Sequence, residues 1–324
     1  LEGAICIGHT RWATHGKPTE TNAHPHASER LAVVHNGIIE NFRVLREELA
    51  AKGYRFATET DTEIAAFLVT DGLNSGLSPA EAVHAALQRM RGAFALVYLF
   101  KGEDNLLIGA RQGAPLAVGQ GEGEMFLGSD ALALAPFTDR VAYLEEGDWV
   151  IASRESVEFR DADGKVVQRR FVKTPAGGLL AEKGNYRHFM AKEIHEQPEV
   201  LGHTVAHYVD MGAQKLKPFD WPCDPKSLNR VTVVACGTAY MAGLIGKYWI
   251  ERFARLPVEV DVASEYRYRE PPVDKGGLTL VVSQSGETAD TLASLKYAKE
   301  NGSRAVAVVN VPTSSIARLA DAQA

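Results

Sequence analysis

Hydrophobic residues in the first half of the chain recur at two spacings, which together predict a mixture of helices and strands. Over residues 41–52 and 61–73 they return every three or four positions, as on the buried face of a helix, and residues 79–90 predict a third helix. Short apolar runs between these segments predict strands. The predicted strands are residues 4–7, 31–34, 38–39, 93–100, 106–111, 116–118, 125–129, 141–144, 148–153, 157–160 and 166–170. Many strands with helices grouped between them favour an α+β layered domain.

The pattern changes in the second half of the chain. Three runs rich in valine and leucine, at residues 231–235, 278–282 and 305–309, alternate with helices expected at 239–254 and 288–301. Buried strands that are each followed by a helix indicate a doubly wound parallel α/β sheet.

A segment rich in glycine and proline separates these two patterns. It contains Pro175, Gly177, Gly178 and Gly184 and shows little hydrophobic periodicity, which is typical of a linker. A helix is expected after it, at residues 188–203, interrupted or bent near Pro198. The predicted organisation is a first domain at residues 1–175, a linker at 176–186 and a second domain at 187–324.

Composition and charge narrow the class of protein. Hydrophobic residues make up 45% and charged residues 23% of the 324 positions, as in ordinary globular proteins. The net charge of −6 argues against a nucleic-acid-binding protein, which needs a basic surface. Three scattered cysteines favour a reducing, cytoplasmic setting. The sequence has no run of 18 or more apolar residues, so no membrane span is expected.

The two ends of the chain predict a fragment. The chain begins with Leu1 rather than methionine, inside what reads as a domain, and it stops at Ala324 where a helix has only just begun. We therefore expect residues of a longer protein to be missing at both ends.

Small polar residues follow two of the three predicted parallel strands. Cys-Gly-Thr-Ala (236–239) comes after the first strand, and Ser-Gln-Ser-Gly-Glu-Thr (283–288) after the second. Open α/β sheets bind ligands at such turns, where free N–H groups at a helix start favour an anion. The alternative is that Ser285 and Thr288 are plain helix caps, and the sequence leaves both interpretations open. Neither turn has a nucleotide-binding pattern.

The first half carries a polar and aromatic segment at residues 9–16. Its Arg11 offers a planar fork suited to a carboxylate, although a structural ion pair would use the same group. Four histidines occur within residues 9–26, but their spacing matches no common zinc site, so no metal site is predicted.

Two further residues in the first half allow both a structural and a functional interpretation. Asn36-Gly37 is typical of a two-residue β-hairpin turn, which local sequence favours. The same pair could instead form an oxyanion hole from a side-chain amide and a backbone N–H. Asp61 precedes a predicted helix, so it could cap that helix or hold a substrate ammonium group.

The turns of the second half resemble those of the sugar isomerase (SIS) family, which binds phosphosugars. The resemblance implies that a sugar phosphate is held by Ser283, Gln284, Ser285 and Thr288. It also implies that Gly237 and Thr238 line the other side of the sugar. Ala239 stands where many members have serine, so one hydroxyl contact is expected to be absent.

Taken together, the motifs resemble the family of glutamine–fructose-6-phosphate aminotransferases (isomerising). The matching segments in the first half are residues 9–16, 22–26, 35–40, 59–63, 128–130 and 144–148, and those after it are 186–190, 192–194 and 196–198. A glutaminase signature followed by an SIS signature is more specific than either motif alone. The resemblance implies an N-terminal-nucleophile domain of the class II glutamine amidotransferases, followed by a truncated SIS domain.

The resemblance also implies roles for individual residues. Arg11 would bind the glutamine carboxylate, and Asp61 with the Gly37 carbonyl would bind its amino group. The remaining roles would be a pocket lining at Thr14 and His15, an oxyanion hole at Asn36 and Gly37, and an ammonia gate at Trp12.

The implied enzyme converts glutamine and fructose 6-phosphate into glutamate and glucosamine 6-phosphate, without a metal or other cofactor, and it can be a homodimer. The family's nucleophile is an N-terminal cysteine, which Cys6 does not match, and its isomerisation residues lie in the missing part. The chain by itself is therefore expected to be inactive. The alternative is a non-catalytic SIS-type phosphosugar sensor, which the Arg11, Asn36 and Asp61 set disfavours.

Overall fold

The computed structural model describes residues 3–11, 15–174, 183–210 and 212–324. The chain divides into two compact units, Leu1–Gly178 and Leu179–Ala324, and each is considered by itself. Most of the predicted linker, together with Trp12 and Thr14, lies outside the described residues.

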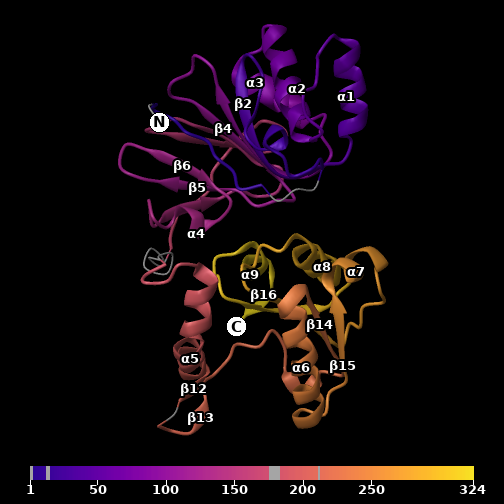
Figure 1. Cartoon of the computed structure of the whole chain (residues 1–324). Helices are drawn as coiled ribbons and strands as arrows, with labels where there is room; N and C mark the ends of the chain where they lie inside the picture. Colours follow the sequence, from indigo (N-terminus) through magenta and orange to yellow (C-terminus); the bar gives the residue numbers. More distant parts are fainter. Residues whose placement is uncertain (1–2, 12–14, 175–182, 211) are drawn as a thin grey trace. The chain divides into compact units, whose positions relative to one another are not determined.

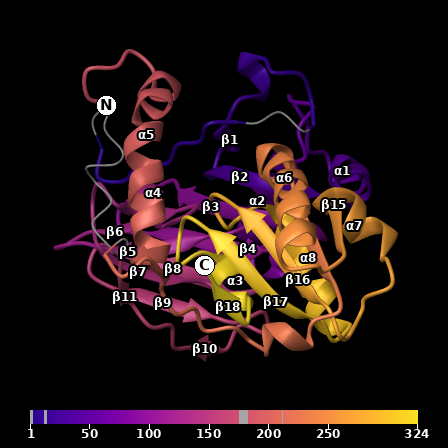
Figure 2. The same cartoon turned by 90° about the horizontal axis from the view of Figure 1, so that it is seen from below.

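The first unit is built from three layers, two of them sheets (Figures 1 and 2). One antiparallel sheet has the order β1 (His26–Ala27), β2 (Leu31–Ile39), β3 (Gly92–Phe100), β4 (Leu107–Gln112), β8 (Trp149–Ala152), β9 (Val157–Arg160) and β10 (Val166–Val167). The other has the order β11 (Val172–Lys173), β7 (Arg140–Tyr143), β5 (Ala117–Gln120) and β6 (Met125–Gly128). The helical elements are η1 (Glu20–Asn22), α1 (Phe42–Ala51), α2 (Thr62–Asn74), α3 (Pro79–Leu87) and α4 (Ala131–Leu134).

Strand β3 joins the two cores of this unit because its side chains alternate between them. Leu96 and Tyr98 pack with Ile64 and other residues of the three helices, whereas Ala95 packs with residues of the second sheet such as Val118. This alternation is the period-two pattern of a strand that is buried on both faces. The α+β layered architecture predicted for this half is confirmed.

Two predictions in this unit were wrong. Asn36-Gly37 forms no hairpin turn: β2 runs unbroken from Leu31 to Ile39 and pairs with β3 throughout. Gly37 takes a φ of +120°, and a Cβ there would lie 2.1 Å from the carbonyl oxygen of Ala93, so the position requires glycine for close strand contact. Residues 4–7 do not form a strand, since no described strand pairs with them.

The second unit contains a five-stranded sheet with the order β15 (Val258–Val262), β14 (Val231–Ala235), β16 (Leu278–Ser283), β17 (Arg304–Val309) and β18 (Ala322–Gln323). All of its strand pairs are parallel, which confirms the predicted sheet type. The remaining elements are α5 (Phe189–Tyr208), β12 (Val209–Asp210), β13 (Lys215–Leu216), η3 (Pro225–Ser227), α6 (Gly237–Phe253), α7 (Ala263–Arg269), α8 (Ala289–Glu300) and α9 (Ser315–Leu319).

Helices cover both faces of this sheet. Ile250 of α6 packs on one face, and α7, α8 and α9 bury residues such as Tyr266, Leu295 and Ile316 on the other. Strand β15 and helix α7 were not predicted from the sequence, and α5 passes through Pro198 without interruption. No helix in the described part of the chain is long and apolar enough to cross a membrane.

Candidate functional site

Arg11 holds the loop that follows it rather than an acidic partner. Its guanidinium group donates hydrogen bonds to the backbone carbonyls of His15, of Gly16 at 3.1 Å and of Lys17 at 3.0 Å. Among the described residues it forms no ion pair, so the structural alternative for Arg11 is not observed. Contacts with the described residues thus use three of the five guanidinium N–H donors, and two remain for a ligand.

Asp61 is buried at the junction of β2 and α2. Its Oδ2 atom accepts a hydrogen bond from the backbone N–H of Ile39 at 2.8 Å and lies 4.0 Å from Nδ1 of His35. Asp61 occupies the N-cap position of α2, but its side chain makes no capping hydrogen bond. The helix-cap interpretation of Asp61 is therefore wrong.

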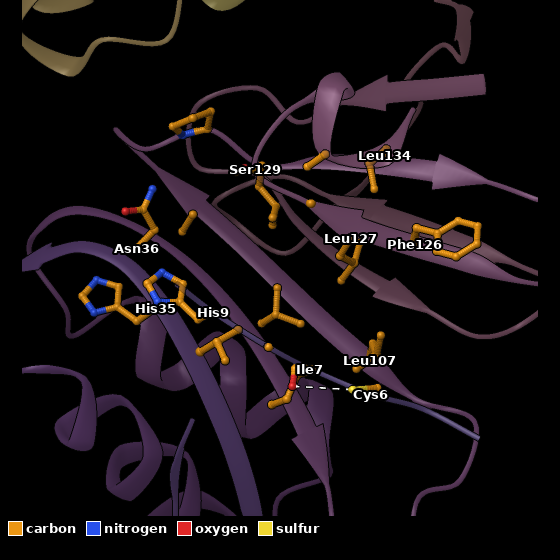
Figure 3. A pocket seen from close by; sticks show the side chains of 18 of the residues that line it. Cys6, Ile7, His9, His35, Asn36, Leu107, Phe126, Leu127, Ser129 and Leu134 are labelled. Atoms are coloured by element: carbon orange, nitrogen blue, oxygen red, sulfur yellow. Dashed lines mark hydrogen bonds between the residues drawn. The ribbon is translucent and has the colours of Figure 1, made fainter. Parts of the chain in front are cut away.

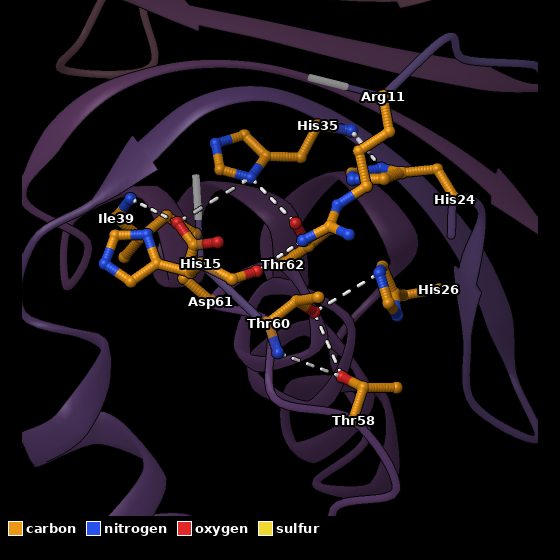
Figure 4. A network of polar contacts seen from close by, with 10 residues as sticks. All are labelled: Arg11, His15, His24, His26, His35, Ile39, Thr58, Thr60, Asp61 and Thr62. Atoms are coloured by element: carbon orange, nitrogen blue, oxygen red, sulfur yellow. Dashed lines mark hydrogen bonds and ion pairs between the residues drawn. The ribbon is translucent and has the colours of Figure 1, made fainter. Parts of the chain in front are cut away.

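The structure brings Arg11, His15 and Asp61 into one polar cluster (Figure 4). The His15 ring packs edge-on against Phe42, with 5.0 Å between ring centroids. The nearby His26 is close enough to both charged groups that Arg11 lowers its pKa and Asp61 raises it, although burial is the largest effect and lowers it overall. A positive and a negative side chain thus lie in the same cluster, and recognition of an α-amino acid requires such a pair of opposite charges.

Four imidazole rings pack beside this cluster. The ring of His24 lies 4.4 Å from that of His9, 5.0 Å from that of His26 and 6.5 Å from that of His35 between centroids. Burial lowers the pKa of His24 to about 3 and that of His35 to about 4, so both rings are neutral at neutral pH. In the ranges that the structure describes, no group of three or more potential ligands is arranged to hold a metal ion.

Asn36 faces away from this cluster, into a cavity of about 490 Å³ between the two sheets (Figure 3). It lies opposite Ala95 of β3, and directly opposed residues of an antiparallel pair share a face of the sheet. Other residues that line the cavity are Cys6, His9, Leu127 and Ser129. Within the described part of the chain, the Cys6 thiol donates to the carbonyl of Ile7, its neighbour in the chain.

The backbone of Gly37 lies on an open edge of β2. The N–H groups of His35 and Ile39 point to this edge, since they donate to Nδ1 of His24 and to Asp61 rather than to β3. Backbone groups alternate along a strand, so the N–H and C=O of Gly37 point to the same edge. The strand β1 pairs with β2 only at Ala32 and Val33. Gly37 therefore presents an N–H group and a carbonyl beside Asp61.

Strand alternation thus divides the predicted glutamine site between the two faces of β2. Arg11, His15 and Asp61 gather on the helix side, the Asn36 side chain is on the side of the second sheet, and Gly37 joins the two through its backbone. Trp12 and Thr14, the predicted gate and pocket residue, lie outside the described residues.

In the second unit, the two predicted phosphate turns begin side by side. Strands β14 and β16 are neighbours, with Ala235 opposite Val282, so both turns leave the same edge of the sheet. The chain crosses from β14 to β15 on one side and continues at β16 on the other. The turns therefore flank the point where the strand order reverses, which is where open α/β sheets bind ligands.

Serine and threonine hydroxyls organise the second turn. The Ser283 Oγ atom accepts the N–H of Gly286 at 3.1 Å and lies 3.0 Å from Oγ1 of Thr288, and Ser285 Oγ accepts the N–H of Glu287 at 3.2 Å. Thr288 is the N-cap residue of α8 but makes no capping hydrogen bond, so the helix-cap interpretation of Thr288 is wrong. Gln284 is exposed beside this turn.

The first turn is also uncapped. Gly237 begins α6 with a φ of +57°, and the N-cap residue Cys236 makes no side-chain capping bond. Thr238 is exposed in the first turn of this helix. The starts of α6 and α8 therefore leave backbone N–H groups that suit an anion.

A third turn supports the second, and it was not predicted from the sequence. It follows β17, which pairs with β16 so that Ser283 is opposite Val309. The N–H groups of Ser315 and Ile316 donate to Oε1 of Glu287 at 2.7 Å and to the carbonyl of Gly286 at 3.0 Å. The small polar run after β17, residues 310–315, was the signal that could have identified this turn.

Comparison with known families agrees with this division. Residues 9–136 match the glutamine amidotransferase domain, and residues 226–324 match the SIS domain. With the layered first unit and the parallel sheet of the second unit, these matches confirm the fold classes that the resemblance implied.

Curated relatives match almost the whole chain. A glutamine–fructose-6-phosphate aminotransferase [isomerizing] of Bradyrhizobium diazoefficiens is 64% identical to this chain in an alignment that covers 98% of it. The protein of the same name from Mesorhizobium japonicum is 59% identical in an alignment that covers 99% of this chain. The chain covers 52% and 53% of these proteins, so it spans about half of their length. A solved structure, the C-terminal domain of this aminotransferase from Francisella tularensis, is 41% identical with a TM-score of 0.41, covering 44% of this chain and 40% of that one. The family resemblance stated from the motifs is confirmed.

Proposed function

We propose that the protein containing this chain transfers the amide nitrogen of glutamine to fructose 6-phosphate, giving glutamate and glucosamine 6-phosphate. The observation that supports the proposal is that one chain holds two groups of side chains suited to these two substrates: the Arg11–Asp61 cluster in the first unit and the Ser283–Thr288 turn in the second. The curated relatives bear the name of this reaction.

Glutamine is bound by its two charged ends. The free N–H groups of Arg11 bind the α-carboxylate, and the Asp61 carboxylate with the Gly37 carbonyl binds the α-ammonium group. His15 lines this pocket. Thr14 is proposed for the same pocket on the resemblance alone, and Trp12 as the gate through which ammonia passes.

The amide end of glutamine reacts beside Asn36 and Gly37. The resemblance implies attack by a cysteine that is not among the residues of this chain, so these residues contribute charge stabilisation. The Asn36 side-chain amide and the Gly37 N–H would donate to the developing oxyanion, which stabilises the tetrahedral intermediate as ammonia leaves. Ammonia must stay enclosed, since protonation in water would remove its nucleophilic lone pair.

The second unit binds the sugar phosphate. Ser283, Ser285 and Thr288 supply hydroxyl groups, and the uncapped start of α8 supplies backbone N–H groups for the phosphate. Gln284 completes this side of the site, and Gly237 with Thr238 lines the other. No metal or other cofactor is required for these contacts.

The proposed domain limits are those given by the sequence: residues 1–175 for the glutaminase domain, 176–186 for the linker and 187–324 for the first, incomplete SIS domain. We also propose a cytoplasmic enzyme that acts as a homodimer on small molecules, without nucleic acid or membrane partners.

An isotope experiment tests the proposed reaction. The protein, at the full length of its relatives, receives fructose 6-phosphate, amide-¹⁵N glutamine and an excess of unlabelled ammonium chloride. We expect glucosamine 6-phosphate that carries ¹⁵N without dilution, because the nitrogen passes internally. Diluted label would contradict internal transfer, and fructose 6-phosphate binding without any product would support a phosphosugar sensor instead.

Two variants make this test specific for the two sites. Arg11→Ala should abolish glutamate release but leave fructose 6-phosphate binding to the 324-residue chain unchanged. The double variant Ser283→Ala/Thr288→Ala should have the opposite effect. It should weaken fructose 6-phosphate binding by at least about tenfold and leave glutamine binding unchanged. Loss of both ligands in both variants would contradict two separate sites.

A further inference from the structure

A buried asparagine connects the two loops that carry the proposed glutamine-binding charges. Asn22 is 3% exposed and lies at the end of η1. Its Nδ2 atom donates to the Lys17 carbonyl at 3.1 Å and to Oε2 of Glu59 at 3.2 Å, and its Oδ1 accepts the Glu59 N–H at 3.1 Å. A single side chain thus joins residue 17 to residue 59.

Both loops end at a proposed ligand-binding group. The Lys17 carbonyl that Asn22 holds also accepts a hydrogen bond from the Arg11 guanidinium, at 3.0 Å. On the other side, Glu59 precedes Asp61 by two residues. The Asn22 amide therefore lies between the group that would bind a carboxylate and the group that would bind an ammonium ion.

The packing leaves this connection little freedom. A Cβ at Gly16 would lie 2.9 Å from Nδ2 of Asn22 and 3.0 Å from Cβ of Glu59, so Gly16 fits closely between the two side chains. The Lys17 N–H also donates to Oε2 of Glu59, at 3.3 Å. A shift of either loop would break several of these contacts together.

We propose that Asn22 is a positioning residue that holds the Arg11 loop against the Asp61 loop, so that the α-carboxylate and α-ammonium groups of glutamine are bound at a fixed separation. This inference rests on the proposed function. Asn22 itself touches no substrate, and its effect is on ligands that must reach both charged groups at once.

Kinetics of glutamate release from glutamine test the inference in the protein at the full length of its relatives. For Asn22→Ala we expect KM for glutamine to rise about 10- to 100-fold, since buried hydrogen bonds at both loops are lost. We expect kcat to change less than about threefold, because the amide-reacting groups on β2 remain in place. An unchanged KM, or a fall in kcat alone, would overturn the inference.

An inhibitor comparison separates positioning from general damage. Glutaramate has the amide and the carboxylate of glutamine but no ammonium group, so it uses only the Arg11 side. Its inhibition constant should change less than about threefold in Asn22→Ala, whereas that of L-glutamate should rise with KM. Equal losses for both inhibitors would contradict a role in coupling the two groups.

An exchange of donor and acceptor keeps the test valid if Asn22→Ala folds poorly. Asn22→Asp sets two carboxylates against each other at Glu59 and should raise KM strongly. Adding Glu59→Gln supplies an amide donor to the new aspartate and should recover part of the loss in KM, but not all of it, because an aspartate cannot donate to the Lys17 carbonyl. A folded double variant that recovers none of the Asn22→Asp loss would overturn the inference.

The control is Asn105→Ala. Asn105 also joins two loops, accepting the N–H of Arg154 at 2.8 Å, but it precedes β4 at the end of the sheet opposite to Ile39. This variant should leave KM unchanged. If the wild-type protein releases no glutamate, the proposed function fails; if it does so and Asn22→Ala behaves like Asn105→Ala, only the positioning role fails.

Discussion

The carboxylate of Asp61 accepts a hydrogen bond from the backbone N–H of Ile39 at 2.8 Å, across 22 residues of sequence. Asp61 stands at the start of α2 and Ile39 at the end of β2. The bond fixes the helix to the strand edge on which the backbone of Gly37 is exposed. The Asp61 carboxylate therefore stabilises the fold through Oδ2 and, in the proposed function, also binds the substrate ammonium group.

Substitution of Asp61 should separate these two tasks. Asp61→Asn keeps an acceptor oxygen for the Ile39 N–H but loses the charge, so stability should change by less than about 1 kcal/mol while KM for glutamine rises at least about tenfold. Asp61→Ala loses both and should also lower the free energy of unfolding by about 1–3 kcal/mol, because a buried N–H is left without a partner.

Urea unfolding of the 324-residue chain and glutaminase kinetics of the longer protein provide the two measurements. The comparison between the two variants is its own control. Equal destabilisation by Asn and Ala would contradict the hydrogen bond to Ile39, and an unchanged KM in both would contradict the binding role.

Arg11→Lys should show that the shape of the guanidinium matters and not only its charge. Arg11 reaches the carbonyls of His15, Gly16 and Lys17 together, and an ammonium group cannot reproduce that fork. We expect KM for glutamine to rise at least about tenfold with fructose 6-phosphate affinity unchanged. Wild-type KM in Arg11→Lys would mean that the carboxylate is held elsewhere.

The sequence predicted the layers and the parallel sheet well because those elements carry strong periodic patterns. It failed at Asn36-Gly37, where local turn preference favoured a hairpin. The structure instead pairs this segment with β3 over its whole length, and Gly37 is required by the approach of the Ala93 carbonyl. That contact joins residues far apart in the chain, so no local pattern contains it.

The site was predictable in part for the same reason. Thr288 and Asp61 have the residue types and positions of helix caps, yet their side chains bond to Ser283 and to the Ile39 N–H. Which partner a side chain selects depends on tertiary neighbours. The Asn22–Glu59 connection was invisible because asparagine before a turn is common and its partner lies 37 residues away.

The neutral histidines predict a measurable dependence of stability on pH. The pKa values of His24 and His35 are lowered to about 3 and about 4, with burial the largest cause and neighbouring imidazoles adding to it. Unfolded histidine has a pKa near 6.5, so between about pH 6.5 and 4 the unfolded state binds more protons than the folded state. The free energy of unfolding should fall with decreasing pH in this window, by up to about 1.4 kcal/mol per unit for each histidine.

The variant His24→Asn isolates one of these histidines. Asparagine can keep an acceptor for the N–H of His35, which donates to Nδ1 of His24 at 3.2 Å, but it does not titrate. Denaturant unfolding at several pH values gives the slope of the free energy of unfolding against pH, which reports the protons taken up on unfolding. Between pH 6.5 and 4 the variant should take up about one proton fewer than the wild type, and above pH 7 the two slopes should be equal. An identical slope in both proteins would contradict a His24 that stays neutral in the folded protein.

Two glycines at the proposed phosphate site should respond differently to alanine. Gly237 has a φ of +57° and open space where a Cβ would lie, so Gly237→Ala should cost only the backbone strain, about 1–2 kcal/mol. Gly286 has a φ of +66°, and its Cβ would lie 1.9 Å from Oγ of Ser314. Gly286→Ala must also push the third turn away, which adds about 1–3 kcal/mol.

Gly286→Ala should therefore destabilise the second unit more than Gly237→Ala does, and it should weaken fructose 6-phosphate binding by displacing the hydroxyls of Ser283 and Thr288. Urea unfolding and calorimetry of the 324-residue chain measure both effects, and equal losses in the two variants would show that the third turn does not constrain the second.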